Sequence, residues 1–182
     1  LFDKGRLLYG MDKARKAIRA SDEAVIVEGY LDVIVLHQGG FTNTVSPMGT
    51  ALTEDQLRMI KKYARRIVLA LDADAAGEKA TLRGLEVARQ AMDRTAEITS
   101  DSSGIFNARG LVRTEGRLQA DLRVTTIPEG MDPDEVVLRN PEEWTEILHK
   151  AQPIVVHVME ALAANQDLED AKVKADIARK VI

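Results

Sequence analysis

The chain has 182 residues, of which 45% are hydrophobic and 30% charged, and its formal net charge is −4 at pH 7. This length allows one buried core with a smaller appendage, and the lack of cysteine excludes a disulfide framework or a cysteine-ligated zinc site within it. No apolar run is long enough to cross a bilayer and no signal peptide is visible, so we expect a cytoplasmic protein without membrane association. Positive charge is concentrated in residues 1–20 and 58–66, and negative charge in residues 129–146, which indicates a basic flank beside an acidic centre.

The first predicted element is a helix over residues 6–19. Its apolar residues recur at helical spacing and share one side: Leu7, Leu8, Met11, Ala14 and Ile18. Basic residues occupy the other side, and a solvated helix face is the simplest explanation for them. Residues 1–22 are therefore predicted to form a helical lead-in.

A buried strand is predicted over residues 24–27, and it ends in Glu28 and Gly29. A helix follows over residues 30–38 and stops at two glycines. Gly29 allows a tight turn or a close approach to a ligand. Asp32 falls in the first helical turn, where interaction with the helix dipole is an alternative to a functional role.

A third short segment, residues 43–46, is also predicted to be a strand, and a turn follows it. In this turn Gly49 and Thr50 either line a phosphate site or only form the turn. Thr53 and Gln56 have the spacing of a capping box, which predicts a helix from there to about residue 64.

The most informative strand is predicted over residues 67–71, an apolar run typical of a strand covered on both faces. It ends directly in Asp72 and Asp74, which lead into a predicted helix over residues 75–92. Two carboxylates at such an edge are well placed to share a hard divalent cation, although Asp74 would also serve as a helix cap. Residues 95–121 lack periodicity and are predicted to be an inserted loop.

A further strand is predicted over residues 122–127, and it leads into Asp132, Pro133 and Asp134. Asp132 before a proline is also a good helix start. Helices are predicted from residue 141 onward, one of them opening at Gln152 and Pro153 and the last over residues 168–182, with Trp144 as a core anchor.

Strands that alternate with helices predict an α/β fold with a parallel central sheet flanked by helices. The carboxyl ends of its strands share one edge, where six carboxylates converge: Glu28, Asp32, Asp72, Asp74, Asp132 and Asp134. So many like charges would repel one another, and bound cations are the simple remedy.

These residues resemble the Toprim signature, in which a glutamate follows one strand and an Asp-x-Asp pair follows another. Four longer strings resemble the bacterial replicative primase, in the right order: residues 4–10, 27–33, 47–53 and 128–134. The resemblance implies a Toprim catalytic domain over residues 23–140, carrying the 95–121 insert. Residues 1–22 would then end a basic subdomain, and a helical subdomain would follow over residues 141–182. Such primases also carry a zinc-binding domain and a helicase-binding domain, and neither is found in this sequence, so zinc is not expected here.

By resemblance, the function is synthesis of RNA primers from ribonucleoside triphosphates on single-stranded DNA at the replication fork, as part of the primosome. Two or more Mg²⁺ or Mn²⁺ ions would be bound by the six carboxylates, with Glu28, Asp72 and Asp74 as the catalytic residues. Contacts to nucleotide or nucleic acid are expected from Lys4, Arg6, Gly29, Gly49 and Thr50. The replicative helicase would bind through a domain outside this sequence, and we expect the isolated fragment to be weakly active or inactive.

Three alternatives share the same acids. A Toprim nuclease or topoisomerase would cut DNA with them, but a topoisomerase needs a tyrosine nucleophile, and helix packing is the expected role of Tyr9, Tyr30 and Tyr63. A RecR-like module would bind DNA or protein without catalysis, and it would have no need of six acids.

Overall fold

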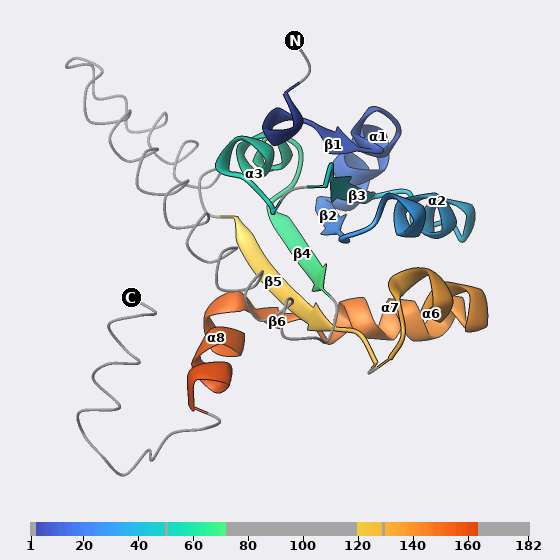
Figure 1. Cartoon of the computed structure of the whole chain (residues 1–182), viewed down its shortest axis with the longest axis vertical. Helices are drawn as coiled ribbons and strands as arrows, with labels where there is room; N and C mark the ends of the chain where they lie inside the picture. The colour runs from blue at the N-terminus through green and yellow to red at the C-terminus, as the bar shows by residue number, and fades with distance from the viewer. Residues whose placement is uncertain (1–2, 50, 72–119, 129, 164–182) are drawn as a thin grey trace, which may run out of the picture.

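A computed structural model describes residues 3–49, 51–71, 120–128 and 130–163 of the chain. Its centre is a six-stranded sheet in the order β1-β3-β2-β4-β5-β6 (Figure 1). The strands are β1 (Leu8–Tyr9), β2 (Glu23–Ile26), β3 (Thr44–Pro47), β4 (Arg66–Leu71), β5 (Asp121–Thr126) and β6 (Gln152–Pro153).

The four inner strands run parallel and the two edge strands run antiparallel to their neighbours. β4 pairs with β5 along its whole length, from Arg66 opposite Asp121 to Leu71 opposite Thr126. The predicted α/β fold with a parallel centre is thus confirmed, whereas the antiparallel edges were not predicted.

Helices cover both faces of this sheet (Figure 1). They are α1 (Met11–Ser21), α2 (Tyr30–Gln38), α3 (Glu54–Lys61), α6 (Pro133–Arg139), α7 (Pro141–His149) and α8 (Ile154–Ala163), and a short 3-10 helix, η1 (Lys4–Arg6), precedes β1. None of the helices in the described ranges is long and apolar enough to span a bilayer.

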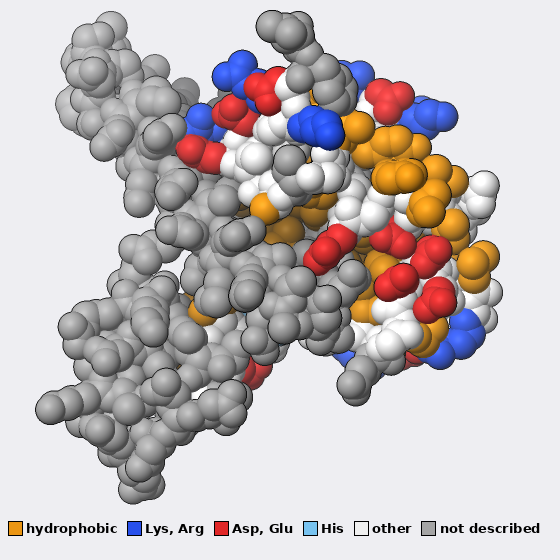
Figure 2. Space-filling view, viewed as in Figure 1, with side chains coloured by type: hydrophobic (Ala, Val, Ile, Leu, Met, Phe, Trp, Pro, Cys, Tyr) orange, Lys and Arg blue, Asp and Glu red, His pale blue; other side chains and the backbone are white. Residues whose placement is uncertain are grey.

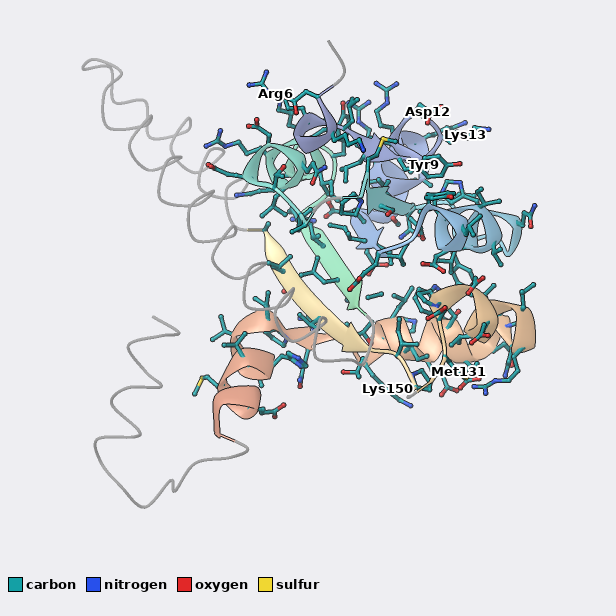
Figure 3. All side chains as sticks on the ribbon, in the orientation of Figure 1. Arg6, Tyr9, Asp12, Lys13, Met131 and Lys150 are labelled. Carbon is teal, nitrogen blue, oxygen red and sulfur yellow. The ribbon has the colours of Figure 1, made fainter. Side chains whose placement is uncertain are left out.

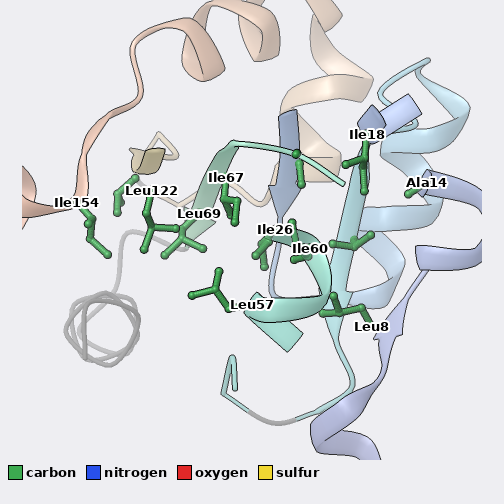
Figure 4. Close-up of a cluster of buried hydrophobic side chains, with 14 of the residues drawn as sticks. Leu8, Ala14, Ile18, Ile26, Leu57, Ile60, Ile67, Leu69, Leu122 and Ile154 are labelled. Atoms are coloured by element: carbon green, nitrogen blue, oxygen red, sulfur yellow. The ribbon is translucent and has the colours of Figure 1, made fainter. Parts of the chain in front are cut away.

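Alternate residues of β2 and β4 enter two separate cores. Ile26 and Ile67 belong to the core beneath α1, α3 and α8, which Figure 4 shows. Val25 and Val68 belong to the core beneath α2, α6 and α7. Burial on both faces explains why these strands are nearly unbroken apolar runs, as the sequence predicted.

The N-terminal region differs from the predicted helix over residues 6–19. Leu8 pairs with Pro47 in the sheet, and the helix begins only at Met11. Gly10 separates the two with a φ of +79°, a conformation that glycine adopts without strain. A second correction concerns Gln152 and Pro153, which form edge strand β6 instead of opening a helix.

Gly10 gives a first testable prediction. A Cβ at this position would lie 2.8 Å from Val33 Cγ1 and would sit on a left-handed backbone, so Gly10→Ala meets both a clash and strain. We expect it to lower the free energy of unfolding by about 1–3 kcal/mol, measured by urea denaturation. Gly40→Ala is the matched control, because its φ is also positive but nothing lies within 4 Å of an added Cβ. Equal losses in both variants would show that the contact with Val33 contributes nothing.

Asp22 joins the starts of two strands and gives a second prediction. Its carboxylate accepts hydrogen bonds from the backbone N–H of Arg65 (2.9 Å) and from Arg65 Nε (2.6 Å). The backbone hydrogen bond, followed by the guanidinium, lowers the pKa of Asp22. The charged carboxylate of Asp22 therefore stabilises the folded chain at pH values above the unfolded-state pKa of about 4. This stabilisation is lost as the pH falls through the lowered pKa of the folded state.

Asp22→Asn keeps an acceptor oxygen and tolerates the positive φ but cannot titrate. Between about pH 5 and pH 2, we expect its unfolding free energy to fall less steeply than that of the unaltered chain, in urea titrations at each pH. Parallel pH profiles would contradict the role assigned to the Asp22 carboxylate.

Candidate active site

Glu28 lies two residues beyond the end of β2, at the carboxyl edge of the parallel strands. The preceding Val27 is fully buried and Glu28 is exposed, so the chain leaves the core and reaches the surface at Glu28. Ser46 Oγ donates a hydrogen bond of 2.7 Å to the backbone oxygen of Glu28. The tips of β2 and β3 are thereby tied together, and the position of Glu28 on the edge is fixed through its backbone.

Asp32 is held against the turn that follows Glu28. The N–H of Gly29 donates to Asp32 Oδ2 over 3.1 Å, which caps the start of α2. An added Cβ on Gly29 would lie 2.6 Å from the same oxygen, so this approach depends on glycine. Asp32 lies in the first turn of α2, where the sequence allowed interaction with the helix dipole. The contact with Gly29 orients its carboxylate at this edge.

Asp132 is the N-cap residue of α6, and Asp134 lies in the first turn of this helix. The N–H of Asp132 donates to Glu135 Oε2 (3.2 Å), and the N–H of Glu135 donates to Asp134 Oδ1 (2.9 Å). Helices α2 and α6 pack on the same core, and Figure 2 shows acidic side chains gathered where the two helices lie side by side. Four of the predicted acids thus follow β2 or β5, the two strands that flank β4 in the sheet.

Asp72 and Asp74 lie outside the described residues, as do the predicted helix over 75–92, most of the 95–121 insert and the last predicted helix. What the structure shows is β4, which ends at Leu71 between β2 and β5 and parallel to both. Within the described ranges, no three His, Asp or Glu residues are arranged so that they could hold a metal ion.

Lys4 and Arg6 lie in η1, on another part of the surface from α6. Arg6 Nε is paired with Asp55 Oδ2 at 3.1 Å, and Figure 3 shows Arg6 and Met131 far apart in the view. The structure therefore does not bring Arg6 to the acids of α6. Lys4 is exposed, and Gln56 Nε2 donates to its backbone oxygen over 3.0 Å, which anchors η1 on α3.

Gly49 forms a turn, which was one of the two predicted roles. It has a φ of +69°, and its N–H donates to the backbone oxygen of Pro47 over 3.1 Å. Thr50 lies outside the described residues.

Sequence reasoning missed the exposure of Tyr30. Its side chain is 61% exposed, and its ring meets Tyr9 edge-on at a centroid distance of 5.8 Å. Helix packing therefore does not account for this tyrosine as predicted. The available signal was its place directly after Gly29, in the first turn of α2, where a side chain projects beyond the sheet.

Comparisons with known proteins bear on the family and the fold of this chain. Residues 22–99 match the family model of the Toprim domain. The DNA primase of Clostridium acetobutylicum is 35% identical over 173 residues, covering 94% of this chain and 24% of the relative. That of Halalkalibacterium halodurans is 39% identical over 137 residues, covering 75% and 18%. The chain thus spans a quarter or less of the length of these relatives.

Solved structures resemble the chain over nearly its whole length. The E. coli primase catalytic core matches with a TM-score of 0.77 and 27% identity, over 98% of this chain and 50% of that one. A DnaG primase catalytic domain bound to single-stranded DNA matches with a TM-score of 0.76 and 26% identity, over 98% and 50%. A DNA primase domain from Pseudomonas aeruginosa matches with a TM-score of 0.73 and 30% identity, over 97% and 48%.

Proposed function

Because this chain carries a Toprim domain like that in the catalytic core of bacterial DNA primases, we propose that it forms the catalytic centre for RNA primer synthesis on single-stranded DNA. In the reaction, a 3′-hydroxyl attacks the α-phosphate of the next ribonucleoside triphosphate and pyrophosphate is released, at a replication fork in the cytoplasm. The observation that carries the proposal is the gathering of acids at one edge. Glu28 and Asp32 follow β2, and Asp132 and Asp134 follow β5, the strands on either side of β4. After β4 the sequence continues with Asp72 and Asp74.

The donor chemistry of this edge fits Mg²⁺ or Mn²⁺, which prefer carboxylate oxygens. The described acids alone form no group of three ligands, so the proposed site depends on Asp72 and Asp74 together with Glu28. When bound, a pair of such cations would neutralise charge on the attacking and leaving oxygens of phosphoryl transfer.

The chain's own residues have distinct proposed roles. Glu28 completes the metal site or accepts a proton near it. Asp32, oriented by the N–H of Gly29, and the two acids of α6 hold further ions directly or through water. Lys4, exposed on η1, contacts phosphate of the nucleotide or primer. Arg6 is a weaker candidate for such a contact because its guanidinium is engaged by Asp55.

The proposed domain limits are 1–22, 23–140 and 141–182. Each flanking segment would add one edge strand to the sheet of the middle unit. β1 of the first segment pairs with β3, and β6 of the last segment pairs with β5. The replicative helicase is a proposed partner, through a domain outside this chain.

Metal binding tests the proposal without an activity readout. In a calorimetric titration with Mn²⁺, we expect the full chain to bind saturably and Asp72→Asn to lose this binding. Asp55→Asn is the control, because it removes an acid that pairs with Arg6 away from the edge. Equal binding in all three proteins, or none in the unaltered chain, would contradict the proposed metal site.

A second assay separates the enzyme classes that share these acids. The full-length gene product is incubated with a single-stranded template and ribonucleotides, or with supercoiled plasmid. Short RNA products would support the proposal. Nicked or relaxed plasmid would instead indicate a nuclease or topoisomerase, and neither product would indicate a binding module.

A further inference from the structure

A group of basic side chains lies at the edge of the sheet opposite the acids. This basic corner consists of Arg15, Lys16 and Arg19 on α1, with Lys61, Lys62 and Arg65 at the end of α3 and just beyond it. Helix α1 leads into the start of β2 and α3 into the start of β4. Because Glu23 lies opposite Arg66 in the parallel register, these two starts are neighbours.

Two contacts join the halves of the basic corner. The guanidinium of Arg19 lies over the ring of Tyr63, 4.7 Å from its centroid. Arg65, from the loop after α3, is paired with Asp22 at the end of α1 through an Nε–Oδ2 distance of 2.6 Å. These two contacts place the end of α1 beside the end of α3, so that the cations of both helices lie on neighbouring elements.

The charge of this surface is far from balanced. Residues 15–23 and 58–66 together contain eight Lys or Arg and two Asp or Glu, in a chain whose net charge is −4. The two acids, Asp22 and Glu23, are already paired with Arg65 and Arg66. Within the described part of the chain, five cations of the corner have no ion-pair partner: Arg15, Lys16, Arg19, Lys61 and Lys62.

Like charges that lie close together repel one another, and the fold itself does not require this arrangement. Burial lowers the pKa of Lys61, and the neighbouring Arg58 lowers it further. The exposed lysines of the corner contribute neither a buried side chain nor an ion pair to the fold. Cations spread along two helices fit an extended polyanion better than a single small anion, since several phosphates can be neutralised at once.

We propose that the basic corner binds the sugar-phosphate backbone of a nucleic-acid strand, as a second contact surface on the side of the sheet away from the acids. The inference rests on the proposed function, which requires a nucleic-acid substrate. β4 has six residues at about 3.3 Å each, so the corner is roughly 20 Å from the acidic edge. At 3.4 Å per step, that distance corresponds to about six base pairs of a duplex.

The test compares the salt dependence of binding for two charge-matched variants of the full chain. Lys16→Gln/Lys62→Gln removes two exposed cations of the corner. Arg139→Gln/Lys150→Gln removes two exposed cations of α6 and α7 that are paired with Glu143 and Glu146. Binding of a fluorescent single-stranded DNA and of an RNA–DNA duplex is followed by anisotropy at several salt concentrations, and thermal melting confirms that both variants fold.

We expect the corner variant to bind nucleic acid more weakly than the unaltered chain. For the single strand, the magnitude of its slope of log K against log salt should decrease by about 1.4. The control variant should keep the slope of the unaltered chain. A loss confined to single strands would assign the corner to the template, and a loss confined to the duplex would assign it to the product. Unchanged slopes in the corner variant would overturn the proposal. So would binding of poly-glutamate as tight as that of DNA, which would indicate an acidic protein partner.

This result is independent of catalysis. If Asp72→Asn abolishes Mn²⁺ binding but leaves the salt dependence of nucleic-acid binding unchanged, both proposals stand. If the full-length gene product makes no primers yet the corner variant of the chain still loses its salt dependence, the catalytic proposal fails and the binding surface remains.

Discussion

Glu28→Gln is expected to reduce primer synthesis by the full-length gene product by roughly 10²–10⁴-fold, with thermal unfolding unchanged. Glutamine preserves the size of the side chain but neither carries the negative charge nor accepts a proton as a carboxylate does. The backbone oxygen of Glu28 keeps its hydrogen bond from Ser46, and the side chain is exposed, so the edge of the sheet should keep its shape. Initial rates of product formation, measured on denaturing gels with ribonucleotide concentration varied, give kcat and KM separately.

Glu142→Gln is the matched control for this experiment. Glu142 is an exposed acid in the first turn of α7, so the substitution makes the same chemical change away from the strand tips. We expect its primer synthesis to equal that of the unaltered protein. Full activity in Glu28→Gln would remove Glu28 from the catalytic set.

The largest effect on stability is expected from Trp144→Ala, which should lower the free energy of unfolding by about 3–5 kcal/mol. Trp144 is fully buried in the core beneath α2, α6 and α7, and its ring meets Phe41 edge-on at 6.4 Å. Removing the indole leaves a cavity in this core, on which α2 and α6 also pack. Urea denaturation followed by circular dichroism measures the loss, since the variant lacks the only tryptophan.

Trp144→Phe tests whether ring volume or the indole nitrogen matters. Among the described residues, Trp144 Nε1 has no hydrogen-bond partner, so phenylalanine should cost much less than alanine. Val156→Ala, at a 41% exposed position of α8, should change the free energy of unfolding by less than about 0.5 kcal/mol. A loss below about 1 kcal/mol in Trp144→Ala would mean that the core closes around the missing ring.

The sheet was predictable from sequence wherever a strand is covered on both faces. Residues 67–71 are uniformly apolar because Ile67 and Leu69 enter one core while Val68 and Ala70 enter the other. Thr53 and Gln56 likewise formed the capping box that their spacing predicted, with hydrogen bonds of 3.0 and 3.2 Å. Each of these signals is local, since it depends on the spacing of neighbouring residues.

The two edge strands could not be predicted in this way. β1 and β6 have two residues each, too few to show a period, and the apolar residues around Leu8 also fit a helix. Gly10 was the one local sign of a break. The ion pair of Arg6 with Asp55 spans 49 positions in the sequence, so no spacing rule could have shown that this arginine already has an acidic partner.

The central position of β4 has a consequence for how the chain opens. β4 has a parallel partner on each side and a helical layer on each face, so its amide hydrogens reach solvent only when both layers separate. Amide exchange there should be among the slowest in the chain and governed by global unfolding, whereas the two-residue edge strands exchange through local fraying. Side chains carried at the ends of the inner strands are thus supported by the part of the molecule that opens least often.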